Sequence, residues 1–487
     1  MLRAGKSIPV KAQLYQHQKD AFHFVMKLFG LVAGAGFEPT TSTGAALLME
    51  MGTGKTITSI AVTGALYQTG IIKRVLIVAP LSILGVWQEE FSKFANFDYT
   101  LAMLTGSGIK KLDTLHHMSG TVLQVAVINY ESAWRMEKEL LQWNADLIIA
   151  DEGHKIKTHN ISAAKAIHKL GAKARYKLLL TGTVITNKAI DVFSQYKFLN
   201  PVVFGPSFYV FRNRYFDMVG YGNHTPVLKR SMEQELTSRL HSIAFRATKA
   251  ECLDLPEMTD IIRHIDLEPA AMKIYRDLVK DSYAELGKGE ITVTNVLTRL
   301  LRLSQLTGGF IGDDESGSVQ KISEAKLQAL EDILDTTLQE DKKLVIIARF
   351  VPEIKAICKM LEKKDIRYSL IMGGVKDRTE QVEQFQNSPE ISVFVGQIAT
   401  AGLGITLTAA STMVFYSLDY SMSNFEQTKA RIHRVGQKSK CTYLYLIVKG
   451  TVDEKVLKAL RQKADLAKTL VDDFRGGKNP FAKMEEP

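Results

Sequence analysis

The stretch Leu48-Met49-Glu50-Met51-Gly52-Thr53-Gly54-Lys55-Thr56 decides how this chain is interpreted. An apolar run leads into two spaced glycines, and a helix-like pattern follows from Ile57. Glycines let backbone N–H groups approach a polyphosphate closely, and a helix N-terminus adds partial positive charge. Lys55 is placed to reach the outer phosphates, and the Thr56 hydroxyl to hold Mg²⁺. The stretch predicts an ATP-binding loop. Met49 stands where the usual pattern has glycine, so a simple glycine-rich turn stays an alternative.

A second stretch, Asp146-Leu147-Ile148-Ile149-Ala150-Asp151-Glu152-Gly153-His154, supports this interpretation. An apolar run of strand length ends in two adjacent carboxylates, at the edge where a parallel sheet presents its ligands. Asp151 would orient Mg²⁺, and Glu152 would accept a proton from water that attacks the γ-phosphate. An acidic helix N-cap is the alternative. Two such stretches in the right order favour the nucleotide site.

Length and composition set wide bounds. The chain has 487 residues, enough for two to four domains. Its 46% hydrophobic and 23% charged content exclude a disordered chain. The net charge is +10 and the sequence pI is about 9.2, which permits an anionic partner such as nucleic acid. The charge is spread along the chain without a long basic block, so it supports nucleic acid only weakly.

Cysteine usage and hydropathy indicate the environment. Cys252, Cys358 and Cys441 lie far apart and have no metal-ligand spacing, which favours a reducing compartment. No apolar run is long enough to cross a bilayer, and the first residues lack the apolar segment of a secretory signal. We therefore expect a soluble, cytoplasmic protein without a membrane partner.

Strand-like runs alternate with helical patterns in two halves of the chain. In the first half, residues 74–80, 122–128, 146–151 and 176–180 are predicted strands; in the second, residues 343–348, 368–372, 391–395, 413–416 and 442–448. This is the pattern of parallel sheets covered on both faces. Aromatic and basic residues gather between the halves. They can stack on nucleic acid, but a helical core face with solvated charges is favoured.

The second half carries Arg431 and Arg434 in a predicted helix that opens at Glu426 and Gln427. The two arginines lie one helical turn apart on one face. In a two-lobed motor, ATP held by one lobe is completed across the cleft by the other, and arginines supplied there neutralise charge on the transferring phosphoryl group. Closure of the lobes is thereby coupled to ATP.

With these motifs in order, the chain resembles the Swi/Snf-type helicase-like ATPases of superfamily 2 over residues 14–457. The resemblance implies an α/β fold of two RecA-like lobes with parallel sheets and helical protrusions. Lobe 1 would span residues 1–255, with a helical protrusion over 206–250. Lobe 2 would span 256–470, with a helical insertion over 267–310, and residues 471–487 would form a mobile tail.

The resemblance also carries residue roles onto matching positions. The ATP-binding residues would be Gln18, Met51, Gly52, Thr53, Gly54, Lys55, Thr56, Gly404 and Gln427. The catalytic residues would be Lys55, Asp151, Glu152, Arg431 and Arg434, with Mg²⁺ on Thr56 and Asp151. The residues that couple the lobes would be His154, Thr181, Gly182 and Thr183. The DNA contacts would be Pro80, Ser82, Asn129, Tyr130, Arg349 and Thr400. The sequence departs from the family pattern at Thr53, Val184 and Thr406.

The implied function is a DNA-dependent ATPase that translocates on DNA and remodels duplex, fork or protein–DNA structures in replication, recombination or repair. The implied cofactors are ATP and Mg²⁺, and a replication or recombination protein is the expected partner besides DNA. The sequence has no long insertion between the motifs of its second half and no added reader module. It therefore resembles compact phage or bacterial members. An RNA helicase and an ATP-gated DNA clamp stay open as alternatives.

Overall fold

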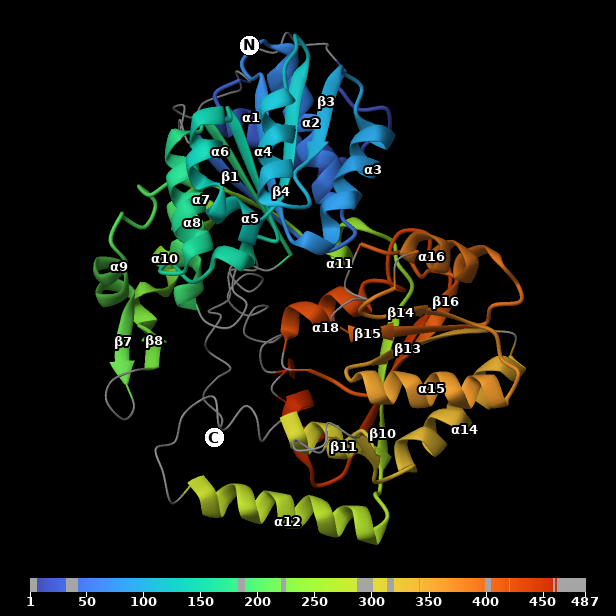
Figure 1. The fold of residues 1–487 in the computed structure, drawn as a ribbon. Coiled ribbons are helices and arrows are strands. Elements are labelled where there is room, and N and C mark those ends of the chain that lie inside the picture. Colours follow the sequence, from blue (N-terminus) through green and yellow to red (C-terminus); the bar gives the residue numbers. More distant parts are fainter. Residues whose placement is uncertain are drawn as a thin grey trace. The chain divides into compact units, whose positions relative to one another are not determined.

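The computed structural model describes residues 7–31, 43–182, 189–219, 225–286, 301–312, 319–340, 342–375, 377–398, 404–419, 421–458 and 460–461. These residues form two compact units, which meet in the chain between Leu253 and Asp254 (Figure 1). Each unit contains a parallel sheet with helices, so the predicted fold class of two α/β lobes is confirmed. The tail predicted over 471–487 lies outside the described residues.

The first unit is built on a seven-stranded sheet in the order β3-β4-β2-β5-β6-β1-β9, and every neighbouring pair is parallel. Its inner strands are buried almost throughout, which explains why they read as unbroken apolar runs. The strands are β1 (Gly44–Met49), β2 (Arg74–Ala79), β3 (Tyr99–Met103), β4 (Leu123–Asn129), β5 (Leu147–Asp151), β6 (Tyr176–Thr181) and β9 (Ala244–Ala247).

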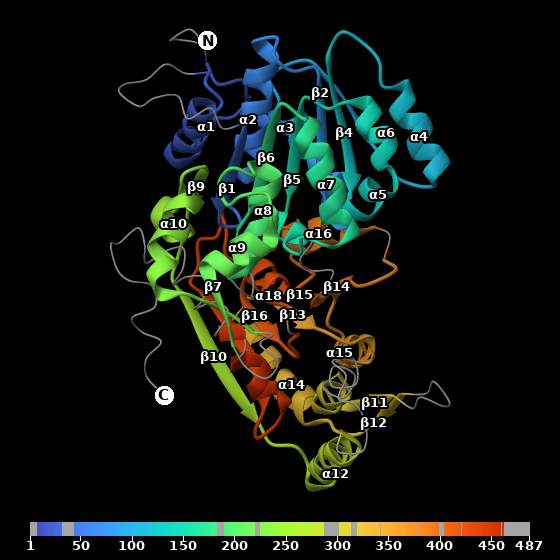
Figure 2. The ribbon, with the colours of Figure 1, turned by 90° about the vertical axis from the view of Figure 1, so that its left-hand side faces the viewer.

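Helices cover both faces of this sheet. α1 packs on α2 and α2 on α3, while α7 contacts α5, α6 and α8. Figure 2 shows α7 and α8 in front of the strands. The helices are α1 (Gln16–Leu28), α2 (Lys55–Gln68), α3 (Leu84–Phe94), α4 (Gly108–His117), α5 (Tyr130–Arg135), α6 (Glu137–Trp143), α7 (Ser162–Lys173), α8 (Val192–Leu199) and α11 (Lys249–Cys252).

The helical prediction for residues 206–250 is incomplete. α9 (Phe208–Tyr215) and α10 (Glu233–His241) are helical, but β7 (Phe216–Val219) and β8 (Thr225–Leu228) form an antiparallel hairpin between them. Pro226 cannot continue a helix interior, and the Phe216 ring packs 5.7 Å from that of Phe211. The segment then returns to the main sheet, where β9 pairs in parallel with β1.

The second unit is built on a six-stranded parallel sheet in the order β10-β17-β16-β13-β15-β14. Figure 1 shows α15 and α16 on opposite sides of its strands. The strands are β10 (Met258–Ile265), β13 (Lys343–Ala348), β14 (Tyr368–Ile371), β15 (Val393–Gln397), β16 (Ala410–Phe415) and β17 (Cys441–Val448). The helices are α12 (Pro269–Leu286), α14 (Ala325–Gln339), α15 (Val351–Lys363), α16 (Arg378–Asn387) and α18 (Met422–Lys429). β11 (Phe310–Gly312) and β12 (Val319–Lys321) form a separate antiparallel pair.

Among the described residues, no helix is both long enough and apolar enough to cross a bilayer.

Candidate active site

The residues after β1 form a tight loop at the carboxyl edge of the first sheet. Gly52 and Gly54 have φ values of +84° and +94°, in the left-handed region that glycine adopts without strain. A Cβ on Gly54 would lie 2.1 Å from Gln18 Nε2, so the Gln18 amide would have to move from this position. α2 then begins at Lys55, with Thr56 as its second residue. The loop and the helix behind it therefore have the form expected of a phosphate site.

The Lys55 side chain folds back over this loop. Its Nζ donates to the carbonyl oxygens of Met49 at 2.8 Å and Glu50 at 3.4 Å. The Thr53 side chain is buried, and its hydroxyl donates to the Glu50 carbonyl at 2.7 Å. Met51 is half-buried beside them. The ammonium group is thus held at the mouth of the loop.

Residues at the start of α1 hold the loop from outside. Gln18 Nε2 donates to the Thr53 carbonyl at 3.2 Å, and His17 Nε2 lies 2.7 Å from the same oxygen. Gln18 Oε1 accepts a hydrogen bond from the Tyr15 amide at 3.0 Å. The Tyr15 ring, 52% exposed, stacks on His17 with 5.9 Å between centroids. The structure brings Gln18 to the loop together with His17 and Tyr15, to which the sequence analysis gave no role. Their place one and three residues before Gln18 is the sequence signal that could have indicated them.

The acidic strand β5 ends beside this loop. Asp151 is buried, and its Oδ2 accepts from Trp87 Nε1 at 3.0 Å while its Oδ1 accepts from the Glu152 amide at 2.9 Å. Burial raises the pKa of the Asp151 carboxyl well above its ordinary range. The Glu152 charge adds to this rise of the pKa, and the Lys55 charge opposes it. The Lys55 ammonium and the Asp151 carboxylate therefore interact at one edge of the sheet.

Glu152 stands in an unusual backbone conformation. Its φ is +52°, a left-handed value that costs a non-glycine residue free energy and often marks a functional site. Its Oε2 lies 3.2 Å from His154 Nδ1, and both side chains are largely buried. A Cβ on Gly153 would lie 2.5 Å from the Leu179 side chain, so the turn packs directly on β6. The structure thus joins Glu152 and His154 in one contact.

β6 brings two further predicted residues to the loop. Its register places Thr181 opposite Leu48, just before the phosphate stretch, and Thr181 is fully buried. A Cβ on Gly182 would lie 3.7 Å from the Met49 carbonyl oxygen, so Gly182 lies alongside the loop. Thr183, the next predicted coupling residue, lies outside the described residues.

The phosphate loop is also tied to the edge strand β9. The Glu50 amide donates to the Ala247 carbonyl at 2.9 Å, and the Lys249 amide donates to Glu50 Oε2 at 2.9 Å. This support comes from a segment that is 199 residues away in the sequence. No local pattern around the loop predicted it.

The predicted DNA contacts of the first unit lie after β2 and β4. Pro80 precedes a short 3₁₀ turn over Leu81–Ile83, which contains Ser82, and Leu81 is 67% exposed. Asn129 is buried and donates to Glu131 Oε2 at 2.9 Å. Tyr130 is also buried, and its hydroxyl donates to the Asp151 carbonyl at 2.7 Å. The Tyr130 side chain therefore supports the acidic strand rather than an exposed surface.

In the second unit, the two predicted arginines donate to the same backbone carbonyl, that of Ile405. Arg431 donates to the Ile405 carbonyl at 3.4 Å and Arg434 at 3.3 Å, next to Gly404, whose φ is +52°. Gln427 lies in α18, and its Nε2 donates to Ser423 Oγ at 3.3 Å. The structure thus brings both arginines and Gly404 together within this unit.

The predicted helix around the two arginines is wrong in its extent. α18 ends at Lys429, so Arg431 and Arg434 lie in the turn that follows. The Ala430 amide still donates to the Glu426 carbonyl, but the Arg431 amide donates to the Thr428 carbonyl, only three residues back, so the helical pattern ends there. Beyond this point the Leu407 amide donates to the Arg431 carbonyl at 2.9 Å. The guanidinium groups converge through this turn and not through helical spacing.

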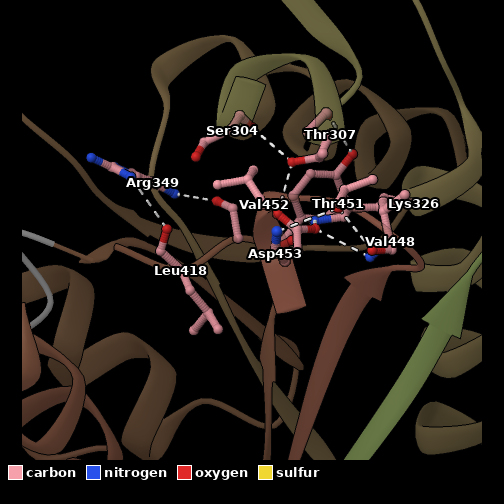
Figure 3. Close-up of polar contacts among 12 residues, drawn as sticks. Ser304, Thr307, Lys326, Arg349, Leu418, Val448, Thr451, Val452 and Asp453 are labelled. Atoms are coloured by element: carbon pink, nitrogen blue, oxygen red, sulfur yellow. Dashed lines mark hydrogen bonds and ion pairs between the residues drawn. The ribbon is translucent and has the colours of Figure 1, made fainter. Parts of the chain in front are cut away.

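Arg349 lies after β13, beside a buried polar network that Figure 3 shows. Its amide donates to Ser417 Oγ at 2.8 Å and to Glu353 Oε2 at 3.2 Å, and its guanidinium to the Leu418 carbonyl at 3.5 Å. Burial raises the pKa of the Glu353 carboxyl to about 7, and the hydrogen bond from Ser417 opposes the rise. Thr400 lies outside the described residues.

The rest of that network is an ion pair between two sequence-distant residues. Lys326 Nζ lies 2.6 Å from Asp453 Oδ2 and donates to the Tyr416 carbonyl at 3.1 Å. Asp453 also accepts from Thr307 Oγ1 at 2.8 Å and from the Val448 amide at 3.2 Å (Figure 3). Nothing in the sequence analysis singled out Lys326, Glu353 or Asp453.

Comparison with known proteins identifies two family matches. The SNF2-related domain matches residues 15–308, and the helicase conserved C-terminal domain matches residues 325–436. "DNA repair and recombination protein RDH54" of Saccharomyces cerevisiae is 26% identical over 88% of this chain and 51% of its own length. "DNA repair and recombination protein RAD54-like" of Drosophila persimilis is 24% identical over 96% of this chain and 65% of its own length.

The chain thus spans about half the length of the first of these curated relatives. A solved structure titled "Sulfolobus solfataricus SWI2/SNF2 ATPase core in complex with dsDNA" is 24% identical, covers 99% of this chain and 97% of that chain, and has a TM-score of 0.46. The SNF2-related match alone extends over more than half of the 487 residues. The chain therefore belongs to the SNF2-related family, as its motifs predict.

Proposed function

We propose that this chain is a DNA-dependent ATPase that translocates on DNA and remodels duplex, fork or protein–DNA structures in replication, recombination or repair. One observation carries the proposal. The phosphate loop with Lys55 and the acidic strand with Asp151 lie at the same edge of one parallel sheet, and their charges interact. Membership of the SNF2-related family supports ATP as the nucleotide.

The residues at this edge fit ATP and Mg²⁺. The two glycines with left-handed φ let the backbone of the loop approach a polyphosphate closely. Asp151 and Glu152 are adjacent, largely buried and mutually repulsive, and a divalent cation would offset that repulsion. Thr56 and Asp151 would hold Mg²⁺, which neutralises charge on the phosphates when bound.

Each side chain then has a role in hydrolysis. Lys55 exchanges its backbone carbonyl partners for the outer phosphate oxygens. Glu152 takes the proton of the attacking water, and the His154 ring 3.2 Å away holds its carboxylate in place. Arg431 and Arg434, from the second unit, would stabilise charge on the transferring phosphoryl group.

DNA as the partner is supported by chemistry and by relatives. The net charge of +10 favours a polyanion. The yeast and fruit fly relatives are both named DNA repair and recombination proteins. We propose that the turn at Pro80 and Ser82 and the segment at Arg349 contact the DNA backbone, and that a replication or recombination protein directs the chain to its substrate.

The testing experiment measures ATP turnover without nucleic acid and with single-stranded DNA, duplex DNA, forked DNA and RNA of equal length. Stimulation by duplex or forked DNA that is lost in Lys55→Ala is the expected result. Stimulation by RNA alone would instead favour an RNA helicase. Turnover that ignores every nucleic acid would overturn the proposal. A dye-displacement assay then separates a translocase from a clamp, because a clamp hydrolyses ATP without directional movement.

A further inference from the structure

Two aromatic residues from different segments hydrogen-bond to Asp151. Trp87 lies in α3, which follows the turn after β2, and its Nε1 donates to Asp151 Oδ2 at 3.0 Å. Tyr130 is the first residue of α5, directly after β4, and its hydroxyl donates to the Asp151 main-chain carbonyl at 2.7 Å. Trp87 is 1% exposed and Tyr130 is 3% exposed. Neither ring is available to touch a ligand.

The sheet order separates these segments from the phosphate loop. β5 lies between β2 and β6, with β4 beyond β2 on one side and β1 beyond β6 on the other. Asp151 at the end of β5 is thus reached by Lys55 from the loop side and by Trp87 and Tyr130 from the other side. Asp151 is therefore the residue that interacts both with the phosphate loop and with the two aromatic residues.

The segments that carry the two rings also reach the surface. Leu81, in the turn six residues before Trp87, is 67% exposed, and Trp134, four residues after Tyr130, is 40% exposed. A polymer that contacts the turn at Leu81 and the exposed face of α5 at Trp134 would press on α3 and α5. Both rings are packed in the core, so a shift of either helix moves its hydrogen-bond donor against Asp151.

The hydrogen bonds from Trp87 and Tyr130 help to fix the position of the Asp151–Glu152 pair. An indole N–H to a buried carboxylate is a charge-assisted bond, which is stronger than a hydrogen bond between two neutral groups. The Tyr130 bond fixes the peptide unit that leads into Glu152, whose left-handed φ leaves it little freedom. A small shift of either donor therefore changes both the Asp151 carboxylate and the aim of the Glu152 side chain.

We propose that Trp87 and Tyr130 are positioning residues that transmit DNA binding at the turn after β2 and at the exposed face of α5 to the Asp151–Glu152 pair. This deepens the proposed function and rests on it. The two rings set how far DNA stimulates ATP turnover, and they do not set how tightly DNA binds.

The test uses the full chain with Tyr130→Phe, which removes only a hydroxyl, and Trp87→Phe, which removes the indole N–H. The matched controls are Tyr99→Phe on β3, whose ring packs 5.2 Å from that of Phe91, and Trp143→Phe at the end of α6, whose side chain is 9% exposed. ATP turnover is measured against duplex DNA concentration, and DNA binding is measured separately by fluorescence anisotropy.

For both core variants we expect the maximal DNA-stimulated turnover to fall about tenfold. The DNA concentration at half-maximal stimulation and the anisotropy Kd should stay within twofold of wild type, and the controls should behave as wild type. If Trp87→Phe does not fold, Tyr130→Phe decides alone.

Three results would overturn the inference. A raised half-maximal DNA concentration with an unchanged maximum would make the rings DNA contacts. An equal loss of basal and stimulated turnover would make them structural, and an unchanged maximum would show no coupling. If wild type itself is not stimulated by DNA, the proposed function fails first and takes the inference with it.

Discussion

The buried ion pair between Lys326 and Asp453 offers a sharp stability test. The Lys326 side chain is 1% exposed and that of Asp453 is 10% exposed, with 2.6 Å between Nζ and Oδ2. Lys326→Met keeps most of the side-chain volume but leaves the carboxylate buried without its cation. Removing one partner of a buried pair costs about 3–5 kcal/mol. Lys449→Met is the matched control, because Lys449 and Asp266 lie 3.0 Å apart with side chains 54% and 76% exposed. Such an exposed pair contributes less than about 1 kcal/mol.

Urea unfolding measures this difference, and two probes separate the two units. The three tryptophans of the chain, at positions 87, 134 and 143, all lie in the first unit. Tryptophan fluorescence therefore follows the first unit, while far-UV circular dichroism follows both. Lys326→Met should lower the urea midpoint seen by circular dichroism, with the fluorescence transition little changed.

The double variant Lys326→Met with Asp453→Leu should regain part of the lost stability, because no unpaired charge stays buried. The reasoning is refuted if Lys326→Met loses no more free energy of unfolding than Lys449→Met. It is also refuted if the double variant loses the sum of the two single losses.

Three further substitutions test other parts of the structure. Gly54→Ala should weaken ATP binding at least tenfold by nucleotide titration, because the φ of +94° is strained for alanine and its Cβ would lie 2.1 Å from Gln18 Nε2; unchanged affinity would contradict the loop geometry. Glu152→Gln should abolish DNA-stimulated turnover while ATP still binds, and intact turnover would remove Glu152 as the base. Between its ordinary pKa of 4.5 and its folded pKa of about 7, the Glu353 carboxyl is protonated in the folded protein but ionised in the unfolded chain. Its contribution to stability is therefore complete below pH 4.5 and is lost as the pH rises through 7. Wild type should lose up to about 1.4 kcal/mol of stability per pH unit across that window relative to Glu353→Gln, and parallel urea midpoints of the two proteins at pH 5.5 and 8 would contradict the shift.

The sequence predicts inner strands such as β2, β4, β5 and β6 well because they are buried on both faces. It does not predict the edge strands β3 and β9, and β3 is only partly buried. A strand such as β5 must then be apolar throughout, and the polar residues that follow it mark the functional edge. The glycine spacing before Lys55 likewise follows from local backbone geometry. These features depend on short stretches, which is why a single sequence reveals them.

Other features depend on partners that are distant in the sequence. From the sequence, Trp87 has the pattern of a core aromatic residue. Only the structure shows that its indole N–H donates to Asp151, 64 residues away. Lys326 and Asp453 are 127 residues apart, and no local pattern links a lysine to an aspartate at that separation. α18 ends at Lys429, and the turn after it is held by the bond from the Leu407 amide to the Arg431 carbonyl, which helical spacing alone does not reveal.

The support that β9 gives to the phosphate loop has a consequence for synthesis of the chain. Glu50 is made 199 residues before Lys249, its partner in that support. At a synthesis rate of about 5–20 residues per second, the Lys249 segment is made about 10–40 s after the phosphate loop. In the last part of that interval, after β6 is made and before β9 is made, β1 is an open sheet edge that can pair with other chains. A chain shortened to end before Ala244 would keep that edge permanently, so nucleotide binding and resistance to aggregation should appear together only once the ribosome has passed this point.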